Sequence, residues 1–297
     1  MTTFGSISSR RSTLPRPGAR FPRITFLRIS VVASVVLFIA SWAEVLGAGD
    51  SGFGDLFTGR AWRGITGFLG EMAGVGETEP PAFLRADRWL ETAALAWQTL
   101  LMSVLAIGLA AGGVLLTILP AARTTAFGPS ALSRSPVWKA AFFLTRGIFI
   151  TTRGIPELMW AMVLIFFFAP GIVPGALALA IHNYGILGKL CAEIVEDMDP
   201  APVRALRAAG ARGFQVVAYG VLPQVLPQFL TYTLYRWEVV IRTTVVVGFV
   251  SAGGLGREFR LHMSWFQYTD VALLLIWYLL LVLAVDLISA WMRRVAR

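Results

Sequence analysis

The 297-residue sequence is poor in the side chains that most catalytic and metal-binding proteins depend on. It contains one cysteine, Cys191, and two histidines, and only 14% of its residues are charged. A lone cysteine excludes an intramolecular disulfide, and these three side chains cannot complete a structural zinc site. The sequence also has no G-x-x-x-x-G-K-[ST] loop, no H-E-x-x-H and no Ser-His-Asp order. We therefore expect no catalytic residue, metal or cofactor on this chain, and any ATP has to be bound by another protein.

Apolar residues dominate the composition. They make up 56% of the chain, and the mean hydropathy of +0.69 is far above that of an ordinary soluble domain. About 20 apolar residues are needed to cross the hydrocarbon of a bilayer. Six runs approach or exceed that length, at 29–48, 93–119, 156–172, 174–191, 222–248 and 269–291. The predicted fold class is an all-α, polytopic membrane protein with about six transmembrane helices.

The net charge of +9 could point to nucleic acid, but the sequence contains no RNP, zinc-finger or basic-helix pattern. The positive charges instead follow the membrane spans. With the N-terminus inside, 18 lysines and arginines fall in cytoplasmic segments and six fall outside. The positive-inside rule then places both termini in the cytoplasm, which predicts a multi-pass protein of the bacterial inner membrane that binds no nucleic acid.

Three segments outside the spans have distinct compositions. Residues 1–28 carry six arginines and no acid, which predicts a cytoplasmic basic tail. Residues 49–88 form an external loop, in which the apolar spacing over 57–72 predicts an interfacial helix. Residues 137–153 mix aromatic and basic side chains and lead to Pro156, which predicts an inner-surface helix that bends or restarts at the proline.

The internal loop over 192–222 is expected to form a helix, a stop and a second helix. Asp199 is suited to begin the first helix, and alanines give that helix a surface without large side chains. Gly210 is suited to a left-handed stop. The segment 199–213 therefore predicts a compact protrusion that a groove of a partner protein can approach closely.

Several charged or polar side chains fall inside the predicted spans, where charge is energetically costly. Glu238 precedes Arg242 by four residues, which favours a pair within one helix. Arg236 points away from Glu238, and Glu157 is its candidate partner. These side chains, with His182 near the middle of the fourth span, either pair structurally or line a path for an anion.

The internal loop resembles the EAA loop of type I ABC importer permeases. The matching residues are Ala205, Ala208, Ala209, Gly210, Ala211, Leu222 and Pro223. The initial glutamate of that motif is replaced here by Arg204. The resemblance implies the type I permease fold over 93–292, with the loop docking on an ATPase that binds ATP and Mg.

Other strings resemble permeases for phosphonate and related phosphorus oxyanions. They are Arg153-Gly-Ile-Pro-Glu-Leu158, Ala178 to Lys189, Tyr235-Arg-Trp-Glu-Val239 with Arg242, and Gly248 to Gly256. The resemblance implies a homodimer around one path, two ATPase subunits inside and an external solute-binding protein. The Gly253-Gly254-Leu255-Gly256 string is expected to form a tight turn rather than a nucleotide site.

Alternative functions stay open from the sequence. A methionine, thiamine or phosphite importer permease has the same overall pattern. An ion-gradient transporter acting alone predicts two similar inverted halves, and no convincing similarity relates 29–140 to 141–297. An intramembrane enzyme or sensor subunit has no motif to support it.

Overall fold

The structure is a computed structural model that describes residues 26–47, 52–127 and 135–295. Every regular element in these ranges is helical, which confirms the predicted all-α class. The chain divides into two compact units, Met1–Thr66 and Gly67–Arg297. Residues 1–25 of the predicted basic tail lie outside the described residues.

The first unit contains a membrane-type helix. Helix α1 spans Phe26–Gly47, and it is long and apolar enough to cross a membrane. The short η1 follows at Gly54–Phe57, and α2, at Gly59–Met72, begins in the first unit and ends in the second. Helix α2 lies where the apolar spacing predicts a helix, and its position at the membrane surface stays a prediction.

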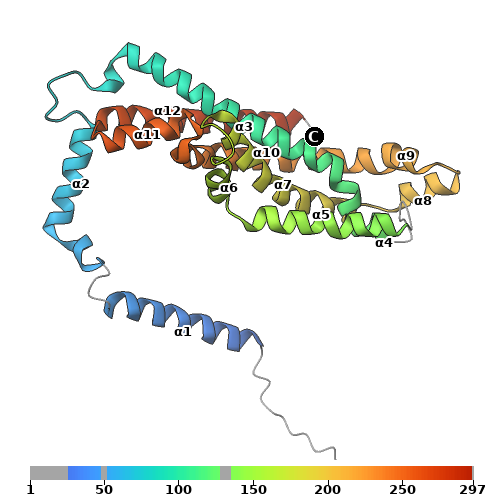
Figure 1. The fold of residues 1–297 in the computed structure, drawn as a ribbon. Coiled ribbons are helices and arrows are strands. Elements are labelled where there is room, and N and C mark those ends of the chain that lie inside the picture. Colours follow the sequence, from blue (N-terminus) through green and yellow to red (C-terminus); the bar gives the residue numbers. More distant parts are fainter. Residues whose placement is uncertain (1–25, 48–51, 128–134, 296–297) are drawn as a thin grey trace, which may run out of the picture. The chain divides into compact units, whose positions relative to one another are not determined.

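The second unit is a bundle built around one central helix (Figure 1). Helix α7, at Ile172–Asp197, packs against α3 (Ala86–Ala121), α5 (Pro136–Gly154) and α10 (Leu222–Val247). Helix α12, at Tyr268–Val295, packs on α3 and α10. Small residues keep α7 thin, and most of them are fully buried. In a membrane, such residues let helix backbones approach closely and strengthen van der Waals contact.

Two glycines set the distance between α5 and α7. A Cβ atom on Gly185 would lie 2.3 Å from Thr152 Oγ1, and one on Gly188 would lie 2.3 Å from Phe149 Cζ. Neither position has room for a side chain unless its neighbours move. The crossing of α5 and α7 therefore depends on glycine at both positions.

The prediction of one continuous third span over 156–172 is wrong. Helix α6 covers only Glu157–Leu164, so at 1.5 Å per residue it is about 12 Å long, well short of the hydrocarbon thickness of about 30 Å. Turns and bends follow it until α7 begins at Ile172. The expected restart at Pro156 is confirmed, because α5 ends at Gly154 and Ile155 is extended. Proline has no N–H to continue the preceding helix.

Three described helices are long and apolar enough to cross a membrane: α1, α3 and α12. The helical stretch 213–250 becomes a fourth span when it is joined to α11 (Gly254–Ser264), which is inclined to it by 49°. The predicted spans at 29–48, 93–119, 222–248 and 269–291 therefore coincide with these helices. Helix α7 covers the predicted span 174–191.

The internal segment 192–222 is more helical than the prediction of a long loop. Helix α7 continues to Asp197, and a nearly unbroken helical stretch begins again at Gly213. The connection itself consists of α8 and two short turns. The remaining short elements are η2 (Ala82–Leu84), α4 (Arg123–Phe127), α8 (Ala201–Ala208), α9 (Gly213–Val216) and the π-helical turns η3 (Val217–Val221) and η4 (Gly248–Ala252).

Candidate functional site

Helix α8 is defined at both ends by local hydrogen bonds. At its start, Asp199 Oδ1 accepts a hydrogen bond from the Ala201 amide at 2.9 Å. At its end, the Gly210 amide donates to Arg207 O and the Ala211 amide donates to Leu206 O, both at 3.0 Å. This pair of bonds forms a Schellman stop, which requires the left-handed backbone seen at Gly210, with φ of +82°. The helix and stop predicted over 199–213 are confirmed.

One side of α8 packs and the other faces outward. Val203 is buried, and Leu206 rests over Gly220 in η3, where a Cβ atom would lie 2.9 Å from Leu206 Cδ1. The outward side carries Ala205, Ala208 and Ala209, all exposed. Helix α8 lies at one end of the bundle and packs on η3 and α9 (Figure 1). It therefore presents a small-residue surface on a firmly packed base.

The other predicted coupling residues follow α8 along the chain. Gly210 is exposed and Ala211 is half-buried directly after the stop. Leu222 and Pro223 are exposed at the start of α10. Arg204, which replaces the glutamate of the motif, is exposed on α8.

A polar cluster lies between α6, α7 and α10. His182 Nδ1 is 2.9 Å from Ile155 O, and His182 Nε2 is 3.2 Å from Glu157 Oε2. Next along α7, the buried Asn183 donates through Nδ2 to Leu179 O at 2.7 Å. Its Oδ1 accepts a hydrogen bond from Arg236 Nε. The structure thus brings together three of the predicted membrane residues, Glu157, His182 and Arg236.

The direct partner of Arg236 differs from the expected one. The sequence predicts Glu157, but the hydrogen bond runs to the amide of Asn183. The carboxylate of Glu157 contacts His182 instead. Asn183 is missed by the sequence interpretation, although a buried amide next to a membrane histidine is a recognisable signal.

The predicted pair between Glu238 and Arg242 is wrong. Arg242 Nη2 contacts both carboxylate oxygens of Asp286 on α12, at 2.9 and 2.7 Å. Glu238 contacts Arg293, also on α12. Tertiary packing overrides the favourable spacing within α10, because a facing helix offers each group its own counter-charge. A single acid in the apolar run of α12 is the signal that could have identified Asp286.

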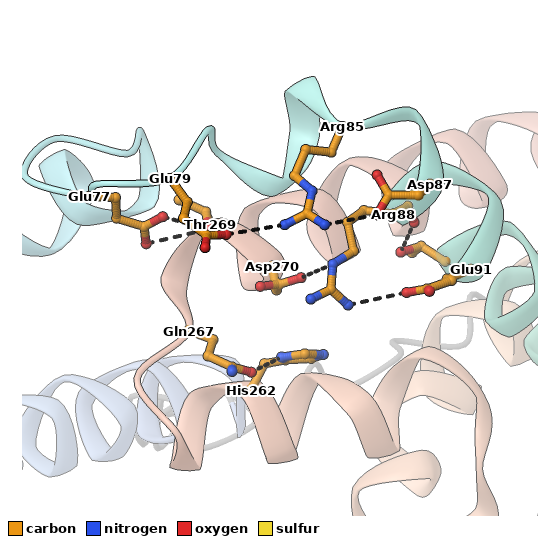
Figure 2. A network of polar contacts seen from close by, with 11 residues as sticks. Glu77, Glu79, Arg85, Asp87, Arg88, Glu91, His262, Gln267, Thr269 and Asp270 are labelled. Carbon is orange, nitrogen blue, oxygen red and sulfur yellow. Dashed lines mark hydrogen bonds and ion pairs between the residues drawn. The ribbon is translucent and has the colours of Figure 1, made fainter.

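At the opposite end of the bundle, polar side chains line a cavity of about 490 Å³ (Figure 2). Arg85 contacts Asp87 at 2.9 Å and Glu79 at 3.5 Å, while Arg88 contacts Glu91 at 3.1 Å. The hydrogen bond from Arg85 lowers the pKa of the Asp87 carboxyl, and the same bond raises the pKa of Arg85. This network joins the segment before α3 to the start of α12, where Thr269 and Asp270 also take part.

The prediction of a tight turn over Gly253-Gly254-Leu255-Gly256 is only partly correct, because the backbone turns at Gly253 but helix α11 already begins at Gly254. Gly253 and Gly254 have φ of +88° and +66°, which favours glycine. A Cβ atom on Gly256 would lie 2.0 Å from Val245 O. The Leu255 amide donates to Thr99 Oγ1 at 2.9 Å, which attaches the turn to α3.

No group of three His, Cys, Asp or Glu side chains is placed to hold a metal ion within the described ranges. The single cysteine, Cys191, is free and buried in α7.

Comparison with known proteins identifies relatives of this chain. Its residues 130–297 match the family of binding-protein-dependent transport system inner membrane components. The chain is 37% identical over 219 residues to a phosphite transport system permease protein of Stutzerimonas stutzeri, covering 74% of this chain and 75% of that protein. It is 31% identical over 201 residues to a phosphate-import permease protein of Mycolicibacterium smegmatis, covering 68% of this chain and 36% of that protein.

Solved structures show the same fold. A chain of a methionine ABC transporter in an inward-facing conformation superimposes with a TM-score of 0.60 at 18% identity, covering 72% of this chain and 99% of that chain. A chain of a bacterial alginate importer superimposes with a TM-score of 0.53 at 14% identity, covering 90% of this chain and 96% of that chain. The match over 130–297 and the identity to the phosphite permease together show that this chain belongs to the binding-protein-dependent transport system inner membrane components, the permease subunits of ABC importers.

Proposed function

We propose that this chain forms the translocation path of an ATP-driven importer for a phosphorus oxyanion such as phosphite, phosphate or a phosphonate. The two relatives at 37% and 31% identity are named for phosphite transport and phosphate import, which supports this substrate class. The likeness to the methionine transporter, at 18% identity, concerns the fold alone and does not favour methionine as a substrate. The arginine inside the bundle, Arg236, is consistent with an anionic substrate.

The observation that carries the proposal is the outward, small-residue surface of α8. Ala205, Ala208 and Ala209 are exposed on a helix whose other side is buried by Val203. A surface of this kind allows a partner's groove to approach the helix backbone, and α8 lies on the segment that resembles the EAA loop. We assign α8 and the Gly210 stop to docking on a separate ATPase, which binds ATP and Mg.

The remaining partners follow from this assignment. Two copies of the chain enclose one path in the inner membrane, with α8 and both termini in the cytoplasm. A solute-binding protein delivers the anion at the opposite end, where the Arg85 and Arg88 network lies. Closure of the ATPase dimer then moves the two α8 helices as rigid bodies, and the path opens alternately to each side.

The experiment is co-purification of the chain with its ATPase, together with uptake of labelled phosphite into vesicles. We expect Gly210→Glu to insert normally in the membrane but to lose the ATPase and at least 90% of uptake, an order-of-magnitude effect, because a non-glycine residue is strained at this φ and a charge obstructs docking. Gly210→Asn is the matched control, since asparagine tolerates the left-handed conformation.

Ala209→Glu separates docking from strain. Ala209 is exposed and has an ordinary φ of −78°, so this variant keeps the stop but places a charge on the proposed docking surface. It should also lose the ATPase. Normal co-purification and uptake of both glutamate variants would contradict the assignment of α8.

A further inference from the structure

We infer that Arg236 is the side chain that recognises the phosphorus oxyanion inside the bundle, and that the His182–Glu157 pair leaves its positive charge uncancelled. This inference rests on the proposed function and names the contact by which the path selects its substrate. It depends on three observations: the partners of the arginines on α10 and α12, the orientation of Asn183, and the hydrogen-bond geometry of His182.

The first observation is a difference between arginines. Arg242 contacts the carboxylate of Asp286, and Arg293 contacts that of Glu238. Arg236 has no carboxylate within 4.0 Å among the described residues, and its hydrogen bond goes to a neutral amide. The first two arginines are therefore neutralised by their own partners, and Arg236 is not.

The second observation concerns how Arg236 is held. Asn183 is 1% exposed, and its Nδ2 donates to Leu179 O at 2.7 Å within α7. That bond orients the amide so that Oδ1 faces the guanidinium. Only Nε of Arg236 is used in this contact, which leaves the N–H donors of the two terminal nitrogens to bind a tetrahedral oxyanion. Arg236 is half-buried, so its side chain is not completely enclosed by the described residues.

The third observation decides the net charge. The Ile155 carbonyl can only accept, so His182 Nδ1 must carry a proton. At 3.2 Å, Nε2 faces a Glu157 oxygen, and two acceptors at that distance repel unless a proton lies between them. With that proton on either atom, His182 and Glu157 together are neutral. The cluster of Glu157, His182, Asn183 and Arg236 then carries one positive charge.

A single uncompensated positive charge in a low-dielectric bundle attracts an anion strongly. A tetrahedral phosphorus oxyanion offers several oxygens to the guanidinium of Arg236. It also supplies the negative charge with which no side chain of the cluster balances Arg236. A neutral or zwitterionic solute supplies less negative charge to balance Arg236. Arg236 therefore acts as a specificity-determining residue, with Asn183 and the His182–Glu157 pair as positioning residues.

The test uses the complete complex of permease, ATPase and binding protein in liposomes, with labelled phosphite, labelled phosphate and labelled methylphosphonate as the probes. Arg236→Gln should reduce uptake of the anion that wild type imports at least tenfold, with ATPase co-purification unchanged. Arg236→Lys keeps the charge but loses the planar fork, so it should recover part of the rate at a raised KM.

The matched control is the double variant Arg242→Gln with Asp286→Asn. It removes an arginine from the same helix together with its counter-charge, and uptake should stay within twofold of wild type. Equal losses in Arg236→Gln and in the control, or wild-type uptake by Arg236→Gln, would overturn the inference. A wild-type complex that imports none of the three anions would overturn the proposed function as well, and that result is read before any variant is made.

Discussion

The two sides of α10 carry charges that are balanced in different ways. On the side facing α12, each charge meets an opposite charge, Glu238 with Arg293 and Arg242 with Asp286. On the side facing α7, Arg236 meets a neutral amide, and the nearby Glu157 is engaged by His182. The first arrangement joins two helices, and the second leaves charge for a ligand. The comparison shows that the role of a charged side chain inside a membrane span depends on the group that it contacts.

The largest expected effect tests the joining role of the α12 side. Glu238→Gln leaves Arg293 without its carboxylate, and both side chains are largely buried, at 17% and 15% exposure. Breaking a buried pair costs about 3 kcal/mol. Thermal unfolding of the detergent-solubilised chain should show a clear drop in Tm. An unchanged Tm would mean that the pair does not hold α10 to α12.

The next effect tests the α7 side. Asn183→Leu removes the amide that orients Arg236 while preserving side-chain size. We expect KM for the oxyanion to rise about tenfold, or about 1.4 kcal/mol, because the guanidinium loses its fixed orientation. Asn183→Asp, which adds a counter-charge to Arg236, should instead reduce uptake further. If uptake by both variants equals that of wild type, Asn183 does not position Arg236.

A smaller effect is expected for the second α10–α12 pair. The side chains of Arg242 and Asp286 are 45% and 36% exposed, so the pair is weaker than the one at Glu238. Arg242→Gln should lower stability by less than about 1 kcal/mol. Comparison of its Tm with that of Glu238→Gln measures how burial changes the strength of a cross-helix pair. A larger loss than in Glu238→Gln would reverse this ranking.

The smallest effect lies outside the membrane spans, at Asp87. The hydrogen bond from Arg85 lowers the pKa of Asp87 below its ordinary value of 3.8. The pair therefore contributes stability above that pH, and the contribution is lost as the pH falls through the lowered pKa. Melting curves at pH 7 and pH 3 should show a slightly smaller acid-induced fall in Tm for Arg85→Gln than for wild type. An identical fall would show that the bond adds nothing measurable.

Much of the architecture follows from patterns along the chain. The apolar runs predict α1, α3, α10 and α12, and the alanines with Gly210 predict α8 and its stop. These features are local, since a span needs about 20 apolar residues and a Schellman stop needs a residue that tolerates positive φ. The prediction of a third span over 156–172 is wrong because it also used a local pattern. An apolar run that begins at Pro156 satisfies hydropathy, but hydropathy does not register where the backbone turns.

The sequence by itself determined that this chain is an all-helical membrane protein with a short helix and a glycine stop between α7 and α10. These features depend on the length of apolar runs, the placement of charges and the position of glycine, all of which are properties of consecutive residues. Only the tertiary structure decided which charges pair. Spacing within α10 favours Glu238 with Arg242, but the facing helix supplies Arg293 and Asp286 from about 50 residues away. Partners on different helices are brought together by packing, and a pattern along one helix does not contain that information.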